Sequence, residues 1–330
     1  MTDLSTVTIL VPGKMNPDTL ATLQSTFSVV RTPGRDISDL SDDQQAAIRG
    51  IAQAGSVPEA LIDALPGLEI IANFGVGYDG VPAAYAAEKG IVVTNTPDVL
   101  TEEVADTAVG LLLMTLREFP AAERHLREGR WHREGAYPLT QMTLRGRHVG
   151  IMGLGRIGLA IARRLEAFGV EIAYHNRSPR SDVSYAYHPD LAALASAVDT
   201  LIIAAPGGAS TEKAVDAAVL KALGPQGVLI NIGRGTTVDE PALIAALKDG
   251  TIAAAGLDVF EDEPHVPEEL IALENTVLLP HVASASRHTR KAMGDLVIAN
   301  LEAWFSGKEP VTPVSECVSA GITCRKSAGA

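Results

Sequence analysis

Cysteine is nearly absent from this sequence of 330 residues. Its two cysteines, Cys317 and Cys324, both lie within residues 317–330, so no disulfide framework is expected, as is typical of proteins of the reducing cytoplasm. Six residues separate them, which does not match the usual metal-binding spacings, and no metal site is expected. We expect both thiols to lie in a disordered tail over residues 317–330.

Aromatic residues and net positive charge are also scarce. Phe, Trp and Tyr make up 4% of the chain, so its cores must be built mainly from Ala, Val, Leu and Ile. The formal net charge is −13, which repels polyanions, and no basic stripe is visible, so nucleic acid is not an expected partner. Arginines that bind an anionic ligand must therefore be concentrated locally.

Long hydrophobic runs are missing. No uncharged apolar run approaches the ~20 residues that a membrane-spanning helix requires, and the longest candidate, at 108–116, suits a buried helix. The first residues show neither a basic start nor an apolar stretch typical of a signal peptide. With 46% hydrophobic and 20% charged residues, the composition is that of a soluble globular protein, and the length favours two domains.

Two runs of alternating strands and helices can be read along the chain. In the first run, the expected strands are 6–13, 68–80 and 91–96, and the expected helices are 18–27, 41–50 and 81–90. A long helix from Thr101 to Phe119 and an irregular, turn-rich segment follow. The second run has expected strands at 148–152, 170–175, 200–205, 227–232, 253–259 and 276–280. A last helix covers 288–307. This alternation favours an α/β fold with parallel sheets, and six strands suit a doubly wound nucleotide-binding domain.

A glycine-rich motif opens the second run. Gly153, Gly155 and Gly158 follow an apolar strand and begin a helix. In this context Gly153 permits a tight turn, Gly155 lets the backbone approach a pyrophosphate, and Gly158 lets helix and strand pack closely. The helix start, with Arg156 and Ile157, would then face the phosphates. The alternative is a plain strand-to-helix turn without a ligand.

The next strand ends without the acidic residue that usually binds the ribose of NAD. Asn176, Arg177 and Ser178 stand there instead, with Arg180 nearby. An acid would repel the 2′-phosphate of NADP, whereas arginine pairs with phosphate through its fork of N–H groups. The stretch therefore predicts a preference for NADP(H) over NAD(H). The alternative is a solvated turn beside an NAD site that lacks an acid.

Polar residues also follow three later strands, where ligands of such sheets bind. They are Arg234, then Asp258 with Glu263, then His281. A histidine can exchange a proton near neutral pH, and a carboxylate from Glu263 would orient its ring and favour its protonated form. Arg234 could hold a substrate carboxylate and polarise a carbonyl. Taken singly, the histidine could be structural, and Arg234 and Glu263 could form a surface ion pair.

These motifs, in this order, resemble the D-2-hydroxyacid dehydrogenases. The resemblance rests on "FGVGYD", "TPDVLTEEVAD", "GLGRIG", "NIGRG", "GLDVFEDEP" and "PHVAS", and it covers residues from about 6 to 316. The sequence is most similar to the bacterial NADPH-dependent glyoxylate/hydroxypyruvate reductases. One departure is "HVASAS", in which Ala283 stands where the family commonly has Gly. A second is Gln53, in a loop over 51–56 that should border the substrate, which leaves the substrate's size open.

The resemblance implies a role for each matching residue. Arg234 would bind the substrate carboxylate and carbonyl, Glu263 would support His281, and His281 would be the general acid. The remaining assignments are the backbone amides of Val76 and Gly77 for the carboxylate, Asp258 for the nicotinamide carboxamide, and Thr107 beside the cofactor.

The resemblance also implies the architecture. It predicts two Rossmann-like domains with the active site in the cleft between them. Residues 1–99 and 287–316 would form a discontinuous substrate domain, and residues 100–286 the dinucleotide-binding domain. Members of the family are usually dimers, so a homodimer is expected.

The sequence thus predicts a cytoplasmic NADP-dependent enzyme that reduces glyoxylate and hydroxypyruvate to D-2-hydroxy acids. Bulkier 2-keto acids of the phenylpyruvate type, or 2-ketogluconate, are alternative substrates. A cofactor-sensing corepressor on the same fold is an alternative from another class. A formate dehydrogenase is disfavoured because no N-terminal insertion is seen, and a phosphoglycerate enzyme because no regulatory domain follows.

Overall fold

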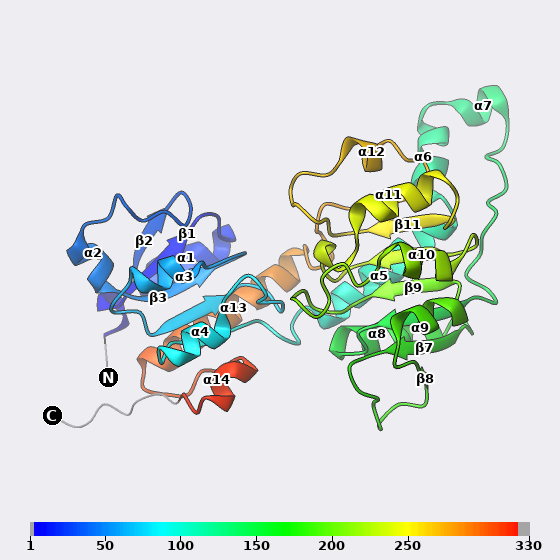
Figure 1. Ribbon diagram of the computed structural model, residues 1–330. Helices are drawn as coiled ribbons and strands as arrows, with labels where there is room; N and C mark the ends of the chain where they lie inside the picture. Colours follow the sequence, from blue (N-terminus) through cyan, green and yellow to red (C-terminus); the bar gives the residue numbers. More distant parts are fainter. Residues whose placement is uncertain (1–2, 323–330) are drawn as a thin grey trace. The chain divides into compact units, whose positions relative to one another are not determined.

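The computed structural model describes residues 3–322, which fold into two compact units (Figure 1). Unit 1 takes its residues from the first hundred positions and from the chain beyond Ala285, and unit 2 comprises Thr101–Ala285. Each unit contains one sheet in which every strand pair is parallel. This is the α/β class with two parallel sheets that the sequence predicts.

Unit 1 is built on a sheet of five strands with the order β2-β1-β3-β4-β5. The strands are β1 (Thr8–Pro12), β2 (Ser28–Thr32), β3 (Ile48–Gln53), β4 (Ile70–Asn73) and β5 (Val92–Thr94). Its helices are α1 (Pro17–Thr26), α2 (Asp42–Ala47), α3 (Glu59–Asp63), α4 (Ala83–Glu88), α13 (Arg287–Phe305) and α14 (Ser315–Ser319). Helix α13 packs on α1 and on β4, so the chain after unit 2 completes unit 1.

Two strands of unit 1 are not expected from the sequence. The expected helix over 41–50 ends at Ala47, and the chain turns directly into β3. Ile48 and Ile51 are fully buried there, so burial in a central strand overrides the helical composition before it. Gly50 does not stop a helix but lies inside the strand, where an added Cβ would meet Ile9 Cδ1 at 2.8 Å. The other strand, β2, lies at the edge of the sheet, and most of its residues are exposed or half-buried.

The C-terminal segment also differs from the expectation of a disordered tail. Cys317 lies in α14 and is buried, and its Sγ accepts a hydrogen bond from the backbone N–H of Val93 at 3.2 Å. The segment therefore packs on unit 1 as far as it is described. Cys324 and residues 323–330 lie outside the described part of the chain.

Unit 2 is built on a sheet of seven strands with the order β12-β11-β10-β9-β6-β7-β8. The strands are β6 (His148–Met152), β7 (Glu171–His175), β8 (Ala186–Tyr187), β9 (Thr200–Ile203), β10 (Val228–Asn231), β11 (Ala254–Leu257) and β12 (Thr276–Leu278). The order reverses between β6 and β9. In doubly wound sheets ligands bind at such a point.

Unit 2 also contains helices, most of which lie against its sheet (Figure 1). They are α5 (Thr101–Leu116), α6 (Phe119–Arg127), α7 (Arg130–Glu134), α8 (Arg156–Glu166), α9 (Leu191–Ala197), α10 (Ala217–Leu223), α11 (Glu240–Lys248) and α12 (Glu268–Ile271), with a 3-10 turn at Gly235–Thr237. The expected helix 101–119 ends early because Glu118 takes a left-handed φ of 52°. Helix α7 lies in the segment expected to be irregular. Both α6 and α7 extend away from the sheet of their unit (Figure 1).

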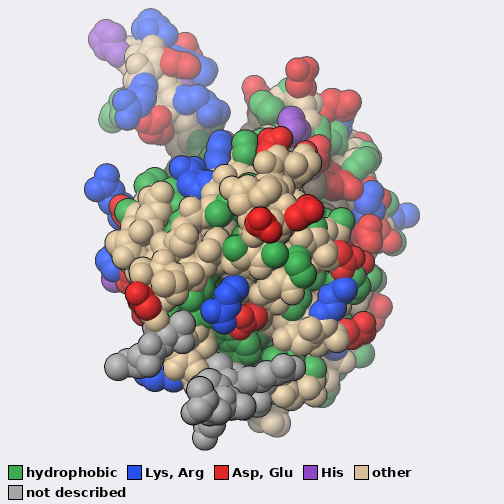
Figure 2. Space-filling view, turned by 90° about the vertical axis from the view of Figure 1, so that its left-hand side faces the viewer, with side chains coloured by type: hydrophobic (Ala, Val, Ile, Leu, Met, Phe, Trp, Pro, Cys, Tyr) green, Lys and Arg blue, Asp and Glu red, His purple; other side chains and the backbone are tan. Residues whose placement is uncertain are grey.

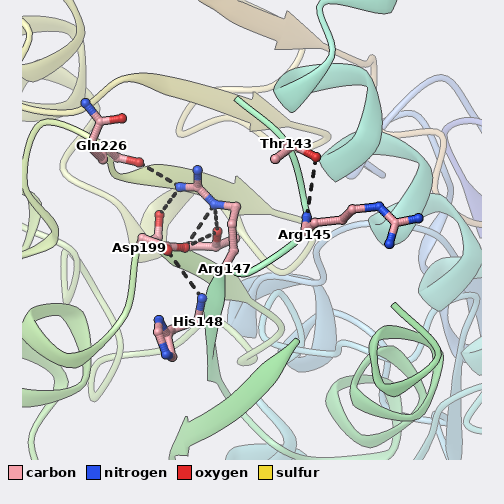
Figure 3. Close-up of polar contacts among 7 residues, drawn as sticks. Thr143, Arg145, Arg147, His148, Asp199 and Gln226 are labelled. Carbon is pink, nitrogen blue, oxygen red and sulfur yellow. Dashed lines mark hydrogen bonds and ion pairs between the residues drawn. The ribbon is translucent and has the colours of Figure 1, made fainter. Parts of the chain in front are cut away.

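A buried arginine joins three segments at the amino ends of the strands of unit 2 (Figure 3). Arg147 Nε donates to Thr200 Oγ1 at 2.7 Å, and its Nη2 donates to the carbonyls of Asp199 and Gln226, each at 2.6 Å. The Asp199 carboxylate lies 2.9 Å from Nε. The Arg147 guanidinium thus donates to hydrogen-bond acceptors at the amino ends of β9 and β10 and links them to the start of β6. These amino ends lie opposite the carboxyl ends of the strands.

Acidic and basic side chains are interspersed on the surface shown in Figure 2, where no continuous basic stripe is visible. Within residues 3–322, no helix has the length and apolar character needed to cross a membrane.

Candidate active site

The glycine-rich loop after β6 depends on the absence of side chains at two positions. Gly153 has a φ of +94°, and an added Cβ would meet the backbone N of Ala205 at 2.6 Å. At Gly158 an added Cβ would come within 2.2 Å of the Gly153 carbonyl oxygen. The first glycine therefore allows the turn, and the last allows α8 to approach the strand.

The middle of the same loop is open. No atom lies within 4 Å of a Cβ added at Gly155, which is exposed and directly precedes α8. The first N–H groups of a helix have no partner within the helix and attract anions. Arg156 begins the helix and is exposed, and Ile157 follows it half-buried. An open backbone at a helix N-terminus fits the pyrophosphate of a dinucleotide.

Asn176 closes this loop from the end of β7. Its Oδ1 accepts a hydrogen bond from the backbone N–H of Leu154 at 2.7 Å, so a side chain at the position of the usual acid holds the glycine loop. Arg180 Nη1 donates to the Leu154 carbonyl at 2.8 Å, and its Nε donates to Asp182 at 2.9 Å. Arg180, expected to face a phosphate, is thus paired with an acid. Arg177 and Ser178 are exposed.

A histidine and a glutamate form a short contact beyond β11 and β12. His281 Nδ1 lies 2.6 Å from Glu263 Oε2, and Glu263 Oε1 accepts a hydrogen bond from the Phe260 N–H at 3.1 Å. An ionised carboxylate only accepts hydrogen bonds, so Nδ1 carries a proton in this pair. The histidine side chain remains 47% exposed, which leaves its other ring nitrogen open to a ligand.

Asp258 holds the segment that carries the histidine. Its carboxylate accepts hydrogen bonds from the N–H groups of Val282 at 2.7 Å and Ala283 at 2.9 Å, and its carbonyl accepts from the His281 N–H at 2.8 Å. This clamp fixes a φ of +51° at His281, a conformation that is uncommon for residues other than glycine. Thr107 on α5 adds a hydrogen bond from Oγ1 to the Ala283 carbonyl at 3.2 Å.

Arg234 lies in the turn after β10 and is held through its backbone. Its carbonyl accepts from Asn231 Nδ2 at 2.9 Å and from Thr237 Oγ1 at 2.6 Å. The turn packs against the backbone of the next loop, since a Cβ on Gly235 would lie 1.8 Å from the carbonyl carbon of Phe260. Sequence reasoning missed Asn231 and Gly235, although both stand in the "NIGRG" motif.

The pKa values of two carboxyl groups in this cluster are shifted in opposite directions. Burial acts to raise the pKa of Glu263, but the hydrogen bond and charge of His281, the Phe260 N–H and the charge of Arg234 together lower it. Burial raises the pKa of Asp258, and the two backbone N–H groups only partly offset this effect. The cluster thus joins a histidine, its carboxylate partner and an arginine whose charge reaches that carboxylate, which is a suitable set for proton transfer to an anionic substrate.

Val76 and Gly77 belong to unit 1, in the turn that follows β4, where both are half-buried. Gln53, expected in a loop that borders the substrate, is instead the last residue of β3 and is completely buried.

Comparison with known proteins places these features in a family. Residues 109–283 match the model of the D-isomer specific 2-hydroxyacid dehydrogenase, NAD binding domain. The structure superposes with a TM-score of 0.93 on the NADPH-dependent glyoxylate/hydroxypyruvate reductase of Sinorhizobium meliloti in complex with NADP and malonate, at 63% identity, covering 95% of this chain and 98% of that one.

Two plant enzymes are also similar. Glyoxylate/hydroxypyruvate reductase A of Arabidopsis thaliana is 53% identical over 81% of this chain and 85% of its own length. Hydroxyphenylpyruvate reductase of Plectranthus scutellarioides is 51% identical over 85% and 88%, respectively. The resemblance expected from the motifs is confirmed: this chain belongs to the D-isomer specific 2-hydroxyacid dehydrogenase family.

Proposed function

We propose that this protein is a reductase that uses NADPH to convert small 2-keto acids, glyoxylate and hydroxypyruvate first among them, to 2-hydroxy acids, with the D configuration wherever the product is chiral. The observation that carries the proposal is the 2.6 Å contact between His281 and Glu263, in the same unit as a dinucleotide-type glycine loop. Its similarity to the Sinorhizobium meliloti reductase supports the choice of substrate and cofactor.

His281 is the proposed general acid. Because Nδ1 is engaged with Glu263, the proton that leaves must be held at Nε2, from which it passes to the oxygen of the substrate carbonyl as that oxygen gains negative charge. Glu263 stabilises the imidazolium before the transfer and keeps the ring oriented. The Asp258 clamp holds the backbone of His281 in place during this step.

The substrate carboxylate is assigned to Arg234, whose guanidinium would also polarise the carbonyl. The family resemblance adds the backbone amides of Val76 and Gly77 to the same carboxylate.

The dinucleotide would be held by Gly153, Gly155, Arg156, Ile157 and Gly158 at the start of α8. Asp258 and Thr107 are assigned to the nicotinamide end. When bound, the reduced nicotinamide supplies the hydride that the protein's own side chains lack.

Selectivity for the 2′-phosphate is assigned to the end of β7. Asn176 removes a negative charge from that position, while the exposed Arg177 and Ser178 offer N–H and O–H donors. Arg180 contributes less than expected because Asp182 neutralises it.

The proposed function is tested by following NADPH oxidation with a panel of 2-keto acids. Glyoxylate and hydroxypyruvate should give the highest kcat/KM, and hydroxypyruvate should yield the D product. The similarity to hydroxyphenylpyruvate reductase makes hydroxyphenylpyruvate the alternative substrate. Absence of turnover with every keto acid, together with intact NADPH binding, would instead favour the cofactor-sensing corepressor.

We further propose a homodimer in the cytoplasm. Support for the dimer comes from apolar side chains exposed on and beside α6 and α7, namely Phe119, Leu126, Trp131 and Leu139. Exposed large apolar side chains of this kind suit contact with a second copy. Sedimentation of the parent and of Trp131→Glu tests this, with a shift toward the monomer mass expected in the variant. For the location, support comes from Cys317, whose buried thiol has no disulfide partner among residues 3–322.

A further inference from the structure

The turn after β4 has an unusual arrangement of backbone groups. Three successive carbonyls, those of Gly75, Val76 and Gly77, are all bound by side-chain amides from the ends of neighbouring strands. Asn73 Nδ2 donates to Gly75 at 3.1 Å and to Gly77 at 3.0 Å, and Asn95 Nδ2 donates to Val76 at 2.8 Å. Gly75 also accepts from the Thr96 N–H at 2.9 Å.

This arrangement determines where the N–H groups of the turn point. In a trans peptide the N–H and C=O groups point in opposite directions. Since the three carbonyls are held by the protein, the N–H groups of Val76, Gly77 and Tyr78 are turned the other way. Among the described residues none of these three N–H groups has a hydrogen-bond partner. Consecutive N–H groups that face one side form a concavity that binds anions.

A third side-chain amide, that of Gln53, supports the amide of Asn73. Gln53 is completely buried, and its Nε2 donates to Asn73 Oδ1 at 2.6 Å. The register pairs Ala52 with Ala72, and Ala72 with Thr94, so Gln53, Asn73 and Asn95 stand on adjacent strand ends. Gln53 Oε1 is buried without a partner in the described part of the chain, a cost that the donor at Nε2 must offset.

We propose that Gln53, Asn73 and Asn95, together called the amide brace, are positioning residues that hold the N–H groups of residues 76–78 ready for a substrate carboxylate. The role of the turn itself follows from the family resemblance, and the inference rests on the proposed function in that respect. The brace acts on the carbonyl side of that turn, and Gln53 belongs to it because its side chain acts through Asn73 rather than on the substrate.

The sharpest variant is Asn73→Asp. It keeps the shape of the side chain and its acceptor for Gln53 but removes both donors to the turn. A charge-assisted hydrogen bond is worth about tenfold or more in affinity, so KM for glyoxylate should rise by about tenfold while kcat stays near the parent value. That split is expected when binding is lost at a carboxylate that does not itself react. The dissociation constant of NADPH should not change.

A second readout does not depend on turnover. Oxalate, a dicarboxylate, should bind the parent in calorimetry, and Asn73→Asp should weaken it by about tenfold. Asn95→Ala, which releases only the Val76 carbonyl, should also weaken oxalate binding. It provides the test if Asn73→Asp does not fold. Gln45→Ala is the matched control, because Gln45 Nε2 donates to the Leu40 carbonyl in the same unit but away from the turn.

The outcomes separate the two proposals. A parent that binds oxalate in a brace-dependent manner but reduces no keto acid refutes the proposed function and leaves the brace standing. A parent that does not bind oxalate overturns the brace. The brace is also overturned if the brace variants keep the parent KM and oxalate affinity, or if Gln45→Ala changes both values as much as Asn73→Asp does.

Discussion

At the scale of single residues, the charge state of the Glu263–His281 pair decides both proton transfer and local stability. The pKa of Glu263 lies below its ordinary value of 4.5 because of its partners. A carboxyl group with a lowered pKa in the folded protein stabilises the fold above its unfolded pKa, and it loses this contribution as the pH falls through the folded value.

Glu263→Gln should therefore lower the melting temperature near neutral pH, and the difference from the parent should narrow below pH 4.5, the ordinary value of this group. Melting temperatures of both proteins between pH 7 and pH 4 provide the measurement. A difference that stays constant or grows on acidification would show that the lowered pKa does not stabilise the fold.

The residues at the end of β7 carry a second prediction. Arg177→Ala should weaken NADPH by about tenfold to a hundredfold, as expected for a lost charge-assisted hydrogen bond of ~1.5–3 kcal/mol, and should leave NADH unchanged. Asn176→Asp should move the preference further toward NADH, because it adds repulsion and a ribose acceptor. The readout is kcat/KM for both cofactors at one saturating keto acid.

Arg133→Ala, which removes an exposed charge on α7, is the control for the Arg177→Ala and Asn176→Asp variants. If the parent already prefers NADH, or if neither change alters the cofactor ratio, the turn is only solvated. Because Asn176 Oδ1 also holds the glycine loop, a loss of affinity for both cofactors in Asn176→Asp would assign it a structural role instead.

At the scale of elements, Arg147 is the clearest test of how the sheet of unit 2 is held. Arg147→Leu leaves the Asp199 carboxylate without its partner and frees three acceptors at the strand ends. Leaving buried hydrogen-bond acceptors without a partner costs ~1–3 kcal/mol in the free energy of unfolding. Urea denaturation followed by circular dichroism measures the loss.

Arg145→Leu is the matched control for Arg147→Leu, since the exposed Arg145 side chain points away from this cluster in Figure 3. Equal urea midpoints for the two variants would contradict the role assigned to Arg147. Unchanged KM values in both variants are expected, because the cluster lies at the amino ends of the strands.

The sequence predicts some elements better than others for physical reasons. Strand β6 and its glycine loop are predictable because the requirements are local. The tight turn requires glycine at position 153, and the close packing of the helix requires glycine at position 158. Strand β3 is not predictable, because the residues before it favour a helix and only burial between two strands selects the extended form. The break at Glu118 and helix α14 likewise depend on contacts outside their own segments.

At the scale of the whole molecule, motif order alone identifies the family, and the candidate site is predictable only in part. His281, Glu263 and Asp258 could be singled out because polar residues at parallel strand ends converge. Asn231, Gly235, Asn73 and Asn95 could not, since their role is to hold backbone and each resembles an ordinary turn residue, and Gln53 could be noticed only as a departure from the family. Arg180 shows the reverse case, because the structure pairs with Asp182 a cation that the sequence offers to a phosphate.

The central claim is that this chain is a reductase in which His281 delivers the proton. The most direct test is kcat for NADPH oxidation by glyoxylate in the parent, in His281→Ala, and in His265→Ala, which removes an exposed histidine from the same loop as Glu263. General acid catalysis is worth at least ~10² in rate, so His281→Ala should lose about that factor while its dissociation constant for NADPH stays at the parent value and His265→Ala remains active. Near-normal turnover in His281→Ala would contradict the account.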